Sequence, residues 1–251
     1  MANNVSEQIS QLSDLITHSG STVFFGGAGV STESGIPDFR SASGLYAAQK
    51  VYGYPPETLL SHTLFLREPR LFFRYYKENL ICKDAKPNKA HLALAEFERR
   101  GRLTAVVTQN VDGLHQAAGS RRVYELHGSN HRQYCMDCGA KYDLAYILDE
   151  SHCKDGLIPV CGECGGTVRP DVVLYEEGLD EQVTAASAEV IGGAELLIVG
   201  GTSLAVYPAA GLLRYFSGEN LVLINKTKTH FDDRAKLVIR APIGEVLGQI
   251  S

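Results

Sequence analysis

The chain has 251 residues, of which 44% are hydrophobic and 21% charged, with a formal net charge of −5. This is the composition of an ordinary globular protein, long enough for one large core or a core with a satellite domain. The acidic balance argues against a nucleic-acid partner, which normally leaves a basic footprint. The polar start MANNVSEQIS and the lack of any apolar run near the ~20 residues that span a bilayer argue against a membrane partner. We therefore expect a cytoplasmic protein.

A first helix is predicted by apolar residues at helical spacing: Val5, Ile9, Leu12 and Ile16. A buried strand is predicted over residues 23–25, and Gly26, Gly27 and Gly29 follow it. Glycine lets backbone N–H groups approach a phosphate closely. Residues 31–34 suit the first turn of a helix. Strand, glycine turn and helix start together are typical of a dinucleotide-binding unit.

The glycine spacing does not fit the G-x-G-x-x-G fingerprint, which disfavours an ordinary dehydrogenase. A glycine turn that merely joins a strand to a helix is the alternative interpretation. An acid, an aromatic ring and a guanidinium just beyond the turn favour phosphate binding: Asp38, Phe39 and Arg40. Residues 41–56 then predict a loop that either folds over a bound cofactor or is an ordinary surface excursion.

Residues 57–83 look helical, and residues 87–101 predict a further helix. An aromatic cluster in the first of these is more typical of a core than of a binding site: Phe65, Phe72, Phe73, Tyr75 and Tyr76.

A polar cluster follows the strand predicted over residues 103–108, and open α/β sheets bind ligands at such strand ends. Asn110 and Asp112 are suited to ribose hydroxyls or an amide, although both residue types also favour plain turns. His127 follows a strand over residues 123–126, at the same expected edge. There an ordinary histidine pKa near 6.5 suits proton abstraction, and a purely structural histidine is the alternative.

Two C-x-x-C pairs lie about two dozen residues apart: Cys135 with Cys138, and Cys161 with Cys164. Four thiolates at this spacing can close a tetrahedron around zinc with no open position, so the predicted metal site is structural. Two redox-active pairs are the alternative. The zinc would stabilise a small module of roughly residues 129–169 that lacks a core of its own. Cys82 and Cys153 receive no role.

The rest of the chain alternates strands with helices. Strands are predicted over residues 170–178, 196–199, 221–224 and 238–239, with helices over 208–216 and from Pro242. The turn over residues 200–204 and Asn225 each follow one of these strands, placed to hold the second half of a dinucleotide. Such alternation predicts a mostly parallel sheet covered by helices on both faces.

Over roughly residues 8–248 the chain resembles the sirtuins, which are NAD-dependent protein-lysine deacylases. The resemblance rests on the following blocks: Gly27-Ala-Gly-Val-Ser, Ser34-Gly-Ile-Pro-Asp-Phe-Arg40, Thr108-Gln-Asn-Val-Asp-Gly-Leu-His115, His127-Gly128, the four cysteines, Arg169-Pro170, Gly201-Thr-Ser-Leu204 with Pro208-Ala-Ala210, and Asn225. Their combination and order are specific to the family.

The resemblance implies an α/β fold in which a Rossmann-like parallel sheet domain carries a smaller helical plus zinc-ribbon domain. Residues 1–40, 84–128 and 170–251 would form the Rossmann-like NAD-binding domain. Residues 41–83 would form the cofactor-binding loop and the helical part of the small domain, and residues 129–169 its zinc-ribbon part.

The resemblance also assigns site residues. One side of NAD would be lined by Gly27, Ala28, Gly29, Thr32, Asp38, Phe39 and Arg40. The nicotinamide and its ribose would be surrounded by Gln109, Asn110, Val111 and Asp112. The adenosine half would be held by Gly201, Thr202, Ser203, Asn225 and Ile243. His127 would be the general base, with Asn110 as a second catalytic residue and the four cysteines as ligands of a structural zinc.

The family reaction consumes NAD. The acetyl-lysine carbonyl oxygen attacks C1′ of the nicotinamide ribose, nicotinamide leaves, and His127 helps to deprotonate a ribose hydroxyl. Because the acyl-lysine itself supplies the nucleophile, no activated Ser or Cys is needed. The substrate, an acyl-lysine protein or peptide, would bind as an added strand along Val172, Val173, Leu174, Glu177 and Gly178.

Three departures from the family pattern bear on these expectations. Gly26 stands where a threonine is common, and Tyr175-Glu176-Glu177 replaces the usual Phe-Gly-Glu next to the peptide. Succinyl-preferring members carry a Tyr-x-x-Arg pair, where this chain has Phe73 and Tyr76. A carboxylate-tipped acyl group would then lack its arginine partner, so we expect acetyl-lysine to be preferred.

Three rival functions are weighed against deacetylation. An ADP-ribosyltransferase would use the same NAD site with another acceptor, but His127 and the apolar substrate strand favour deacetylation. A non-catalytic NAD-sensing adaptor is disfavoured by the complete polar set, and a zinc-ribbon nucleic-acid binder by the acidic balance.

Overall fold

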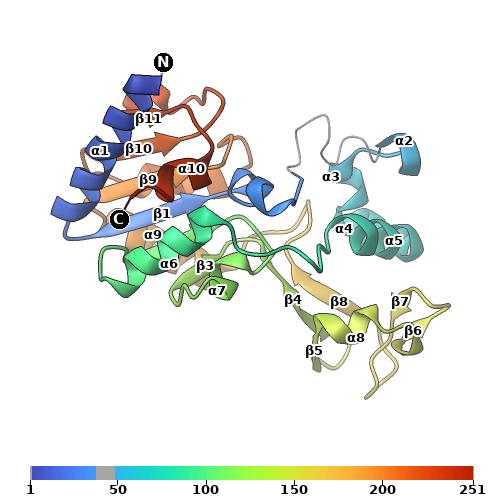
Figure 1. Ribbon diagram of the computed structural model, residues 1–251. Coiled ribbons are helices and arrows are strands. Elements are labelled where there is room, and N and C mark those ends of the chain that lie inside the picture. Colours follow the sequence, from blue (N-terminus) through green and yellow to red (C-terminus); the bar gives the residue numbers. More distant parts are fainter. Residues whose placement is uncertain (1, 38–48, 251) are drawn as a thin grey trace.

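The computed structural model describes residues 2–37 and 49–250, so the expected cofactor contacts Asp38, Phe39 and Arg40 lie outside the described residues. The described chain has a larger and a smaller part (Figure 1). No helix in the described ranges is both long and apolar enough to cross a membrane.

The larger part is built on a six-stranded sheet with the order β11-β10-β9-β1-β2-β3. Its strands are β1 (Thr22–Gly26), β2 (Ala105–Thr108), β3 (Val123–Glu125), β9 (Leu196–Gly200), β10 (Asn220–Ile224) and β11 (Leu237–Ile239). All neighbouring pairs are parallel, as the sequence predicted.

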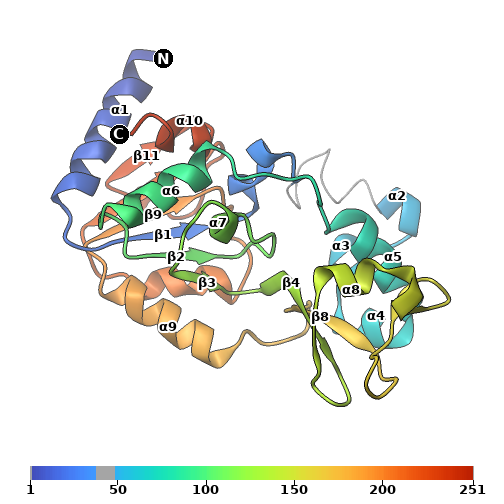
Figure 2. The same cartoon turned by 60° about the horizontal axis from the view of Figure 1, so that its bottom comes forward.

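Helices cover both faces of this sheet (Figure 2). Those of the larger part are α1 (Ala2–His18), α6 (Lys89–Arg99), α7 (Leu114–Ala117), α9 (Glu181–Gly192) and α10 (Ile243–Leu247), with the 3₁₀ helices η1 (Ala28–Val30), η2 (Thr32–Ser34), η5 (Ala209–Tyr215) and η6 (Asp232–Arg234). Alternate strand residues point to opposite faces. Phe24 accordingly packs in a core with residues of α1, α6 and α10, whereas Val23 and Phe25 pack in a second core with residues of α9 and η5.

The smaller part combines helices with short antiparallel strands. Its elements are α2 (Gln49–Tyr52), α3 (Pro56–Leu59), α4 (His62–Arg67), α5 (Pro69–Asn79), β4 (Gly128–Cys135), β5 (Lys141–Asp143), α8 (Leu144–Leu148), η4 (Glu150–His152), β6 (Cys153–Lys154), β7 (Ile158–Pro159) and β8 (Val168–Val172). The sheet β5-β4-β8 is antiparallel. The cysteine-bearing module has no separate core, because Cys135, Cys161 and Ile147 share one cluster with the aromatic residues of α4 and α5.

The expected aromatic core is present, with the rings of Phe65, Phe72 and Phe73 in edge-to-face contacts at 4.9–6.0 Å. We propose the domain boundaries as stated above, with β4 and β8 as the two strands that connect the parts.

The stretch at residues 57–83 is largely helical, as predicted, and is divided into three helices because Ser61 caps the start of α4 and Pro69 starts α5. Other local predictions differ from the structure. The expected helix starts at residues 31–34 and 208–216 are 3₁₀ helices. Of the strand-like run at residues 170–178, only the part up to Val172 is strand. Helix α9 was not predicted.

Two histidines are buried in the larger part, His91 on α6 and His115 on α7, with exposures of 0% and 1%. Their rings meet edge to face at 4.8 Å, and His91 Nδ1 accepts a hydrogen bond from the backbone N–H of Asn88. Burial lowers the pKa of His91 to about 4 and that of His115 to about 3, from 6.5. Both side chains therefore stay neutral in the folded protein at neutral pH.

We predict that this pair makes the fold acid-sensitive. As pH falls below about 6.5, the unfolded chain binds protons at these two groups while the folded protein does not. Each group therefore lowers the free energy of unfolding by up to about 1.4 kcal/mol for every pH unit of acidification. Urea unfolding at pH 7, 6 and 5 should show a shallower pH slope for His115→Gln than for the wild type. His91→Gln is a second test, and the exposed His18→Gln is the control. Equal slopes for the wild type and both buried variants would contradict the prediction.

Candidate active site

The candidate site lies at the carboxyl edge of the parallel sheet, where the turns after β1, β2, β3, β9 and β10 meet. The turn after β1 contacts the turn after β9, since Gly29 N–H donates to Gly201 O at 2.8 Å. A Cβ at Gly29 would lie 2.8 Å from Gly201 Cα, and one at Gly27 would lie 2.8 Å from Thr202 Cβ. Both glycines are therefore required by the close approach of two loops.

A hydrogen-bonded network joins the first turn to the polar segment after β2. Ser31, which is 1% exposed, donates from Oγ to Asp112 Oδ2 at 2.6 Å and accepts from Asn110 Nδ2 at 3.0 Å. The second carboxylate oxygen of Asp112 accepts the N–H of Leu114 at 2.9 Å. Asn110 and Asp112 are thus held in fixed orientations at the strand end.

Two residues of this region were not assigned to the site from the sequence. Ser31 ends the Gly27-Ala-Gly-Val-Ser block, but its hydrogen bonds to Asn110 and Asp112 could not be predicted from the sequence. Asn88, the N-cap of α6, donates from Nδ2 to Val30 O at 2.7 Å and to Ser34 Oγ at 2.9 Å, and so fixes η1 and η2. The Pro87-Asn88 helix start was its only sequence signal.

His127 lies at the same edge, between the end of β3 and the start of β4. Its Nδ1 is 2.9 Å from the carbonyl oxygen of Gln109. A carbonyl oxygen can only accept, so Nδ1 carries the proton and Nε2 is the nitrogen with a lone pair in the neutral ring. Burial lowers the pKa of His127 below 6.5, against the opposing effect of the hydrogen bond to Gln109. At neutral pH the ring is therefore neutral, as a general base must be.

The far half of the edge is formed after β9 and β10. Thr202 Oγ1 accepts from Gln109 Nε2 at 3.1 Å, and Asn225 Nδ2 donates to Thr202 O at 2.8 Å. Ser203 follows Thr202 in the same turn. Ile243, which we expect beside the adenosine half, is at the start of α10, is 3% exposed and packs in the same core as Phe24.

The segment expected to bind peptide leaves β8 and passes His127. The N–H of Val173 donates to the carbonyl oxygen of His127 at 3.0 Å. Leu174 is buried, and the side chain of Glu177 bonds within the protein. Residues 172–178, which begin at the end of β8 in the smaller part, are therefore hydrogen-bonded to the candidate general base.

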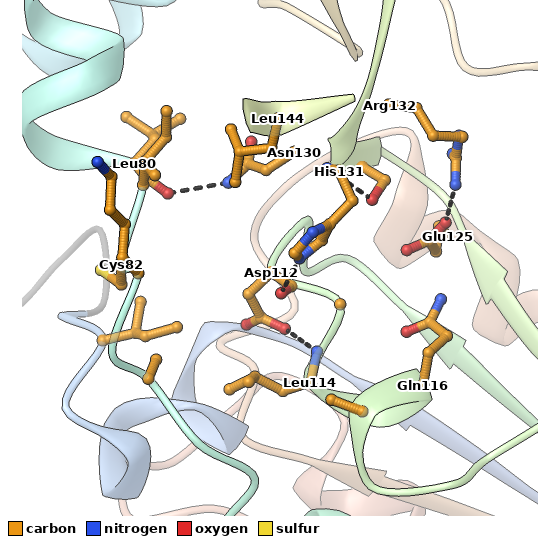
Figure 3. A pocket seen from close by; sticks show the side chains of 17 residues that line it. Leu80, Cys82, Asp112, Leu114, Gln116, Glu125, Asn130, His131, Arg132 and Leu144 are labelled. Carbon is orange, nitrogen blue, oxygen red and sulfur yellow. Dashed lines mark hydrogen bonds and ion pairs between the residues drawn. The ribbon is translucent and has the colours of Figure 1, made fainter. Parts of the chain in front are cut away.

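A cavity of about 530 Å³ opens beside the Asp112 turn (Figure 3). It lies between the linker from α5 to α6, helix α7 and the start of β4, and Leu80, Cys82 and Leu114 contribute to its lining. His131 Nε2 lies 3.0 Å from Asp112 O across this cavity wall.

The four predicted metal ligands converge in the smaller part. Their sulfur atoms all lie within 4.8 Å of one another, with Cys135 to Cys164 at 3.4 Å and Cys138 to Cys161 at 3.6 Å. These separations exceed a disulfide bond of about 2.05 Å and are close to the roughly 3.8 Å edge of a tetrahedron with Zn–S bonds of about 2.3 Å. Four sulfur donors with no fifth ligand among the described residues fit a closed, structural zinc site.

Comparisons with known proteins agree with this geometry. A family model described as "Sir2 family" matches residues 27–208. An NAD-dependent protein deacetylase of Clostridium acetobutylicum is 57% identical over 96% of this chain and 97% of its own length. One of Clostridium perfringens is 54% identical, covering 97% of this chain and 98% of its own.

Solved structures extend the likeness to complexes. A Sir2 protein with deacetylated p53 peptide and 3′-O-acetyl ADP-ribose has a TM-score of 0.86 and 37% identity, covering 95% of both chains. A Sir2 protein bound to acetylated peptide has a TM-score of 0.85 and 36% identity, covering 97% of this chain and 99% of that one.

We predict that Cys135→Ser removes the metal and destabilises the smaller part, because a structural zinc contributes its binding free energy to folding. Zinc content should fall from one equivalent, and the thermal midpoint should drop by on the order of 10 °C. Cys82→Ser, at an exposed cysteine outside the cluster, is the matched control. A zinc-free Cys135→Ser protein with the wild-type midpoint would contradict a structural role.

Proposed function

The chain belongs to the Sir2 family, and from this membership and the geometry of the sheet edge we propose that it is an NAD-dependent protein-lysine deacetylase. It transfers the acetyl group of acetyl-lysine to ADP-ribose and releases nicotinamide and O-acetyl-ADP-ribose. The observation that carries the proposal is His127, a neutral imidazole with its proton fixed on Nδ1, bonded both to the Gln109 segment and to the segment after β8.

The turn after β1, with Gly27, Ala28, Gly29 and Thr32, would lie against the cofactor phosphates. Asn110 and Asp112 would orient the nicotinamide ribose beside Gln109 and Val111, since Ser31 already holds both side chains. Gly201, Thr202, Ser203 and Asn225 would accept the adenosine half. Asp38, Phe39 and Arg40, which lie outside the described residues, complete the proposed set of cofactor contacts.

Bound NAD supplies an electrophilic ribose carbon with nicotinamide as its leaving group. The protein's tasks are then to orient both substrates, to exclude water and to remove one proton. Nε2 of His127 takes the proton of a ribose hydroxyl, and Gln109 O stabilises the imidazolium through Nδ1–H. This division of roles explains why no Ser or Cys nucleophile is required.

The substrate peptide would add as a strand along Val172–Leu174 and Glu177–Gly178, where backbone bonds give affinity with weak side-chain selectivity. Buried Phe73 and Tyr76 offer no cation to a carboxylate-tipped acyl group, and Tyr76 instead donates to Asn130 Oδ1 at 2.8 Å. We therefore propose acetyl-lysine as the preferred substrate. We also propose a cytoplasmic location.

The test is mass spectrometry of an acetyl-lysine peptide with and without NAD. We predict equimolar loss of acetyl and appearance of nicotinamide and O-acetyl-ADP-ribose. His127→Ala should lower turnover by at least about 100-fold, because general-base catalysis typically contributes 10²–10⁴-fold, while NAD binding persists. The exposed His18→Ala is the control. Nicotinamide release with the acetyl group retained would indicate ADP-ribosyl transfer, NAD binding without release an adaptor, and full activity of His127→Ala another base.

The pKa shift gives a separate prediction for pH. Because the pKa of His127 is lowered from 6.5, the base form dominates at neutral pH and is lost only as pH falls below that value. The kcat/KM profile should have its acid limb centred below pH 6.5 and be flat above it. A limb centred above pH 7 would contradict the assignment.

A further inference from the structure

The segment from Val172 to Gly178, which we call the peptide-binding segment, is held by backbone hydrogen bonds at two points. At the first, the N–H of Val173 donates to His127 O at 3.0 Å. At the second, Tyr175 N–H donates to Leu60 O at 3.0 Å, and His62 N–H donates to Tyr175 O at 3.0 Å. The segment is therefore bonded both to the proposed general base and to the junction of α3 and α4.

A buried arginine lies behind this segment. Arg169 on β8 is 6% exposed, and its guanidinium lies over the rings of Phe65 and Tyr134, 5.3 and 5.7 Å from their centroids. It donates to Val172 O at 3.0 Å and to both carboxylate oxygens of Glu177, at 2.7 and 3.0 Å. A buried cation requires such a partner, because an unpaired charge in the interior is costly.

Glu177 is fully engaged inside the protein. Besides Arg169, its carboxylate accepts hydrogen bonds from the N–H of Leu174 and from Nδ1–H of His62, both at 2.8 Å. Burial alone would raise the pKa of Glu177, but the bonds from Arg169, Leu174 and His62 hold it below its usual value. The side chain of Glu177 thus joins β8, the peptide-binding segment and α4. Both of its carboxylate oxygens accept hydrogen bonds before any peptide binds.

Glu176 adds a second tie. Its φ of +78° is in the left-handed region, which is unfavourable for a residue other than glycine. Its Oε2 accepts the backbone N–H of Thr63 at 2.9 Å and the Thr63 hydroxyl at 2.7 Å. Two hydrogen bonds to the first turn of α4 offset the strain and fasten the segment.

We propose that Arg169, Glu177 and His62 form a clamp of positioning residues. The clamp orders the peptide-binding segment before the peptide binds, and the contact of Glu176 with Thr63 reinforces it. The inference rests on the proposed peptide-binding role of residues 172–178. None of the clamp side chains has to touch the substrate. Because the clamp orders the peptide-binding segment in the free protein, it lowers the entropic cost of peptide binding.

The test compares conservative variants with a matched exposed pair. Glu177→Gln keeps the shape but removes the charge, and Arg169→Lys cannot reproduce the bidentate bond together with the bond to Val172 O. Asp155→Asn and Arg70→Lys alter an exposed ion pair at 2.9 Å in the same part of the protein and serve as controls. KM for an acetyl-lysine peptide should rise about tenfold in the clamp variants, with kcat within about twofold. Both controls should match the wild type.

Hydrogen–deuterium exchange without peptide provides a readout that needs no activity. Amides of residues 173–177 should exchange at least about tenfold faster in Glu177→Gln than in Asp155→Asn, and Glu176→Ala should give a smaller increase. Lower kcat with unchanged KM and unchanged exchange in this segment would mean only a loss of folded protein and would overturn the clamp. Faster exchange in a protein whose wild type does not deacetylate would uphold the clamp and refute the proposed function.

Discussion

The parallel register of the central sheet is the constraint on which the rest of the structure depends. Gly26 pairs with Thr108 on one side and with Gly200 on the other, and Gly200 pairs with Ile224. Four strands therefore end at the same level, and their outgoing turns converge. That convergence requires glycine at the contact between turns and puts Gln109 within hydrogen-bond reach of Thr202.

A single backbone acceptor then determines the chemistry of the edge. Gln109 O fixes the proton of His127 on Nδ1, while burial keeps the ring neutral at pH 7. The carbonyl of His127 in turn holds Val173. The base, the polar segment after β2 and the segment after β8 are thus joined by two hydrogen bonds, one from the imidazole of His127 and one between backbone groups.

The sequence predicted the large-scale arrangement well. Apolar runs such as the one ending at Gly26 identified the strands, and cysteine spacing identified a cluster whose sulfur atoms do converge. Contacts between distant residues could not be predicted, because composition does not tell which turns meet. The Ser31–Asp112 bond, the buried His91–His115 pair and the inward-facing carboxylate of Glu177 are of this kind. Helix types near Pro208 were mistaken because periodicity does not separate α from 3₁₀ turns over short stretches.

The central claim is that NAD binds across this converging edge, and hydrogen–deuterium exchange with and without NAD tests it most directly. If NAD binds there, exchange should slow in the turns that begin at Gly27, Gln109 and Gly201 and around Asn225, while helices α1 and α9 stay unchanged. Protection confined to other surfaces, or none at saturating NAD, would contradict binding at this edge.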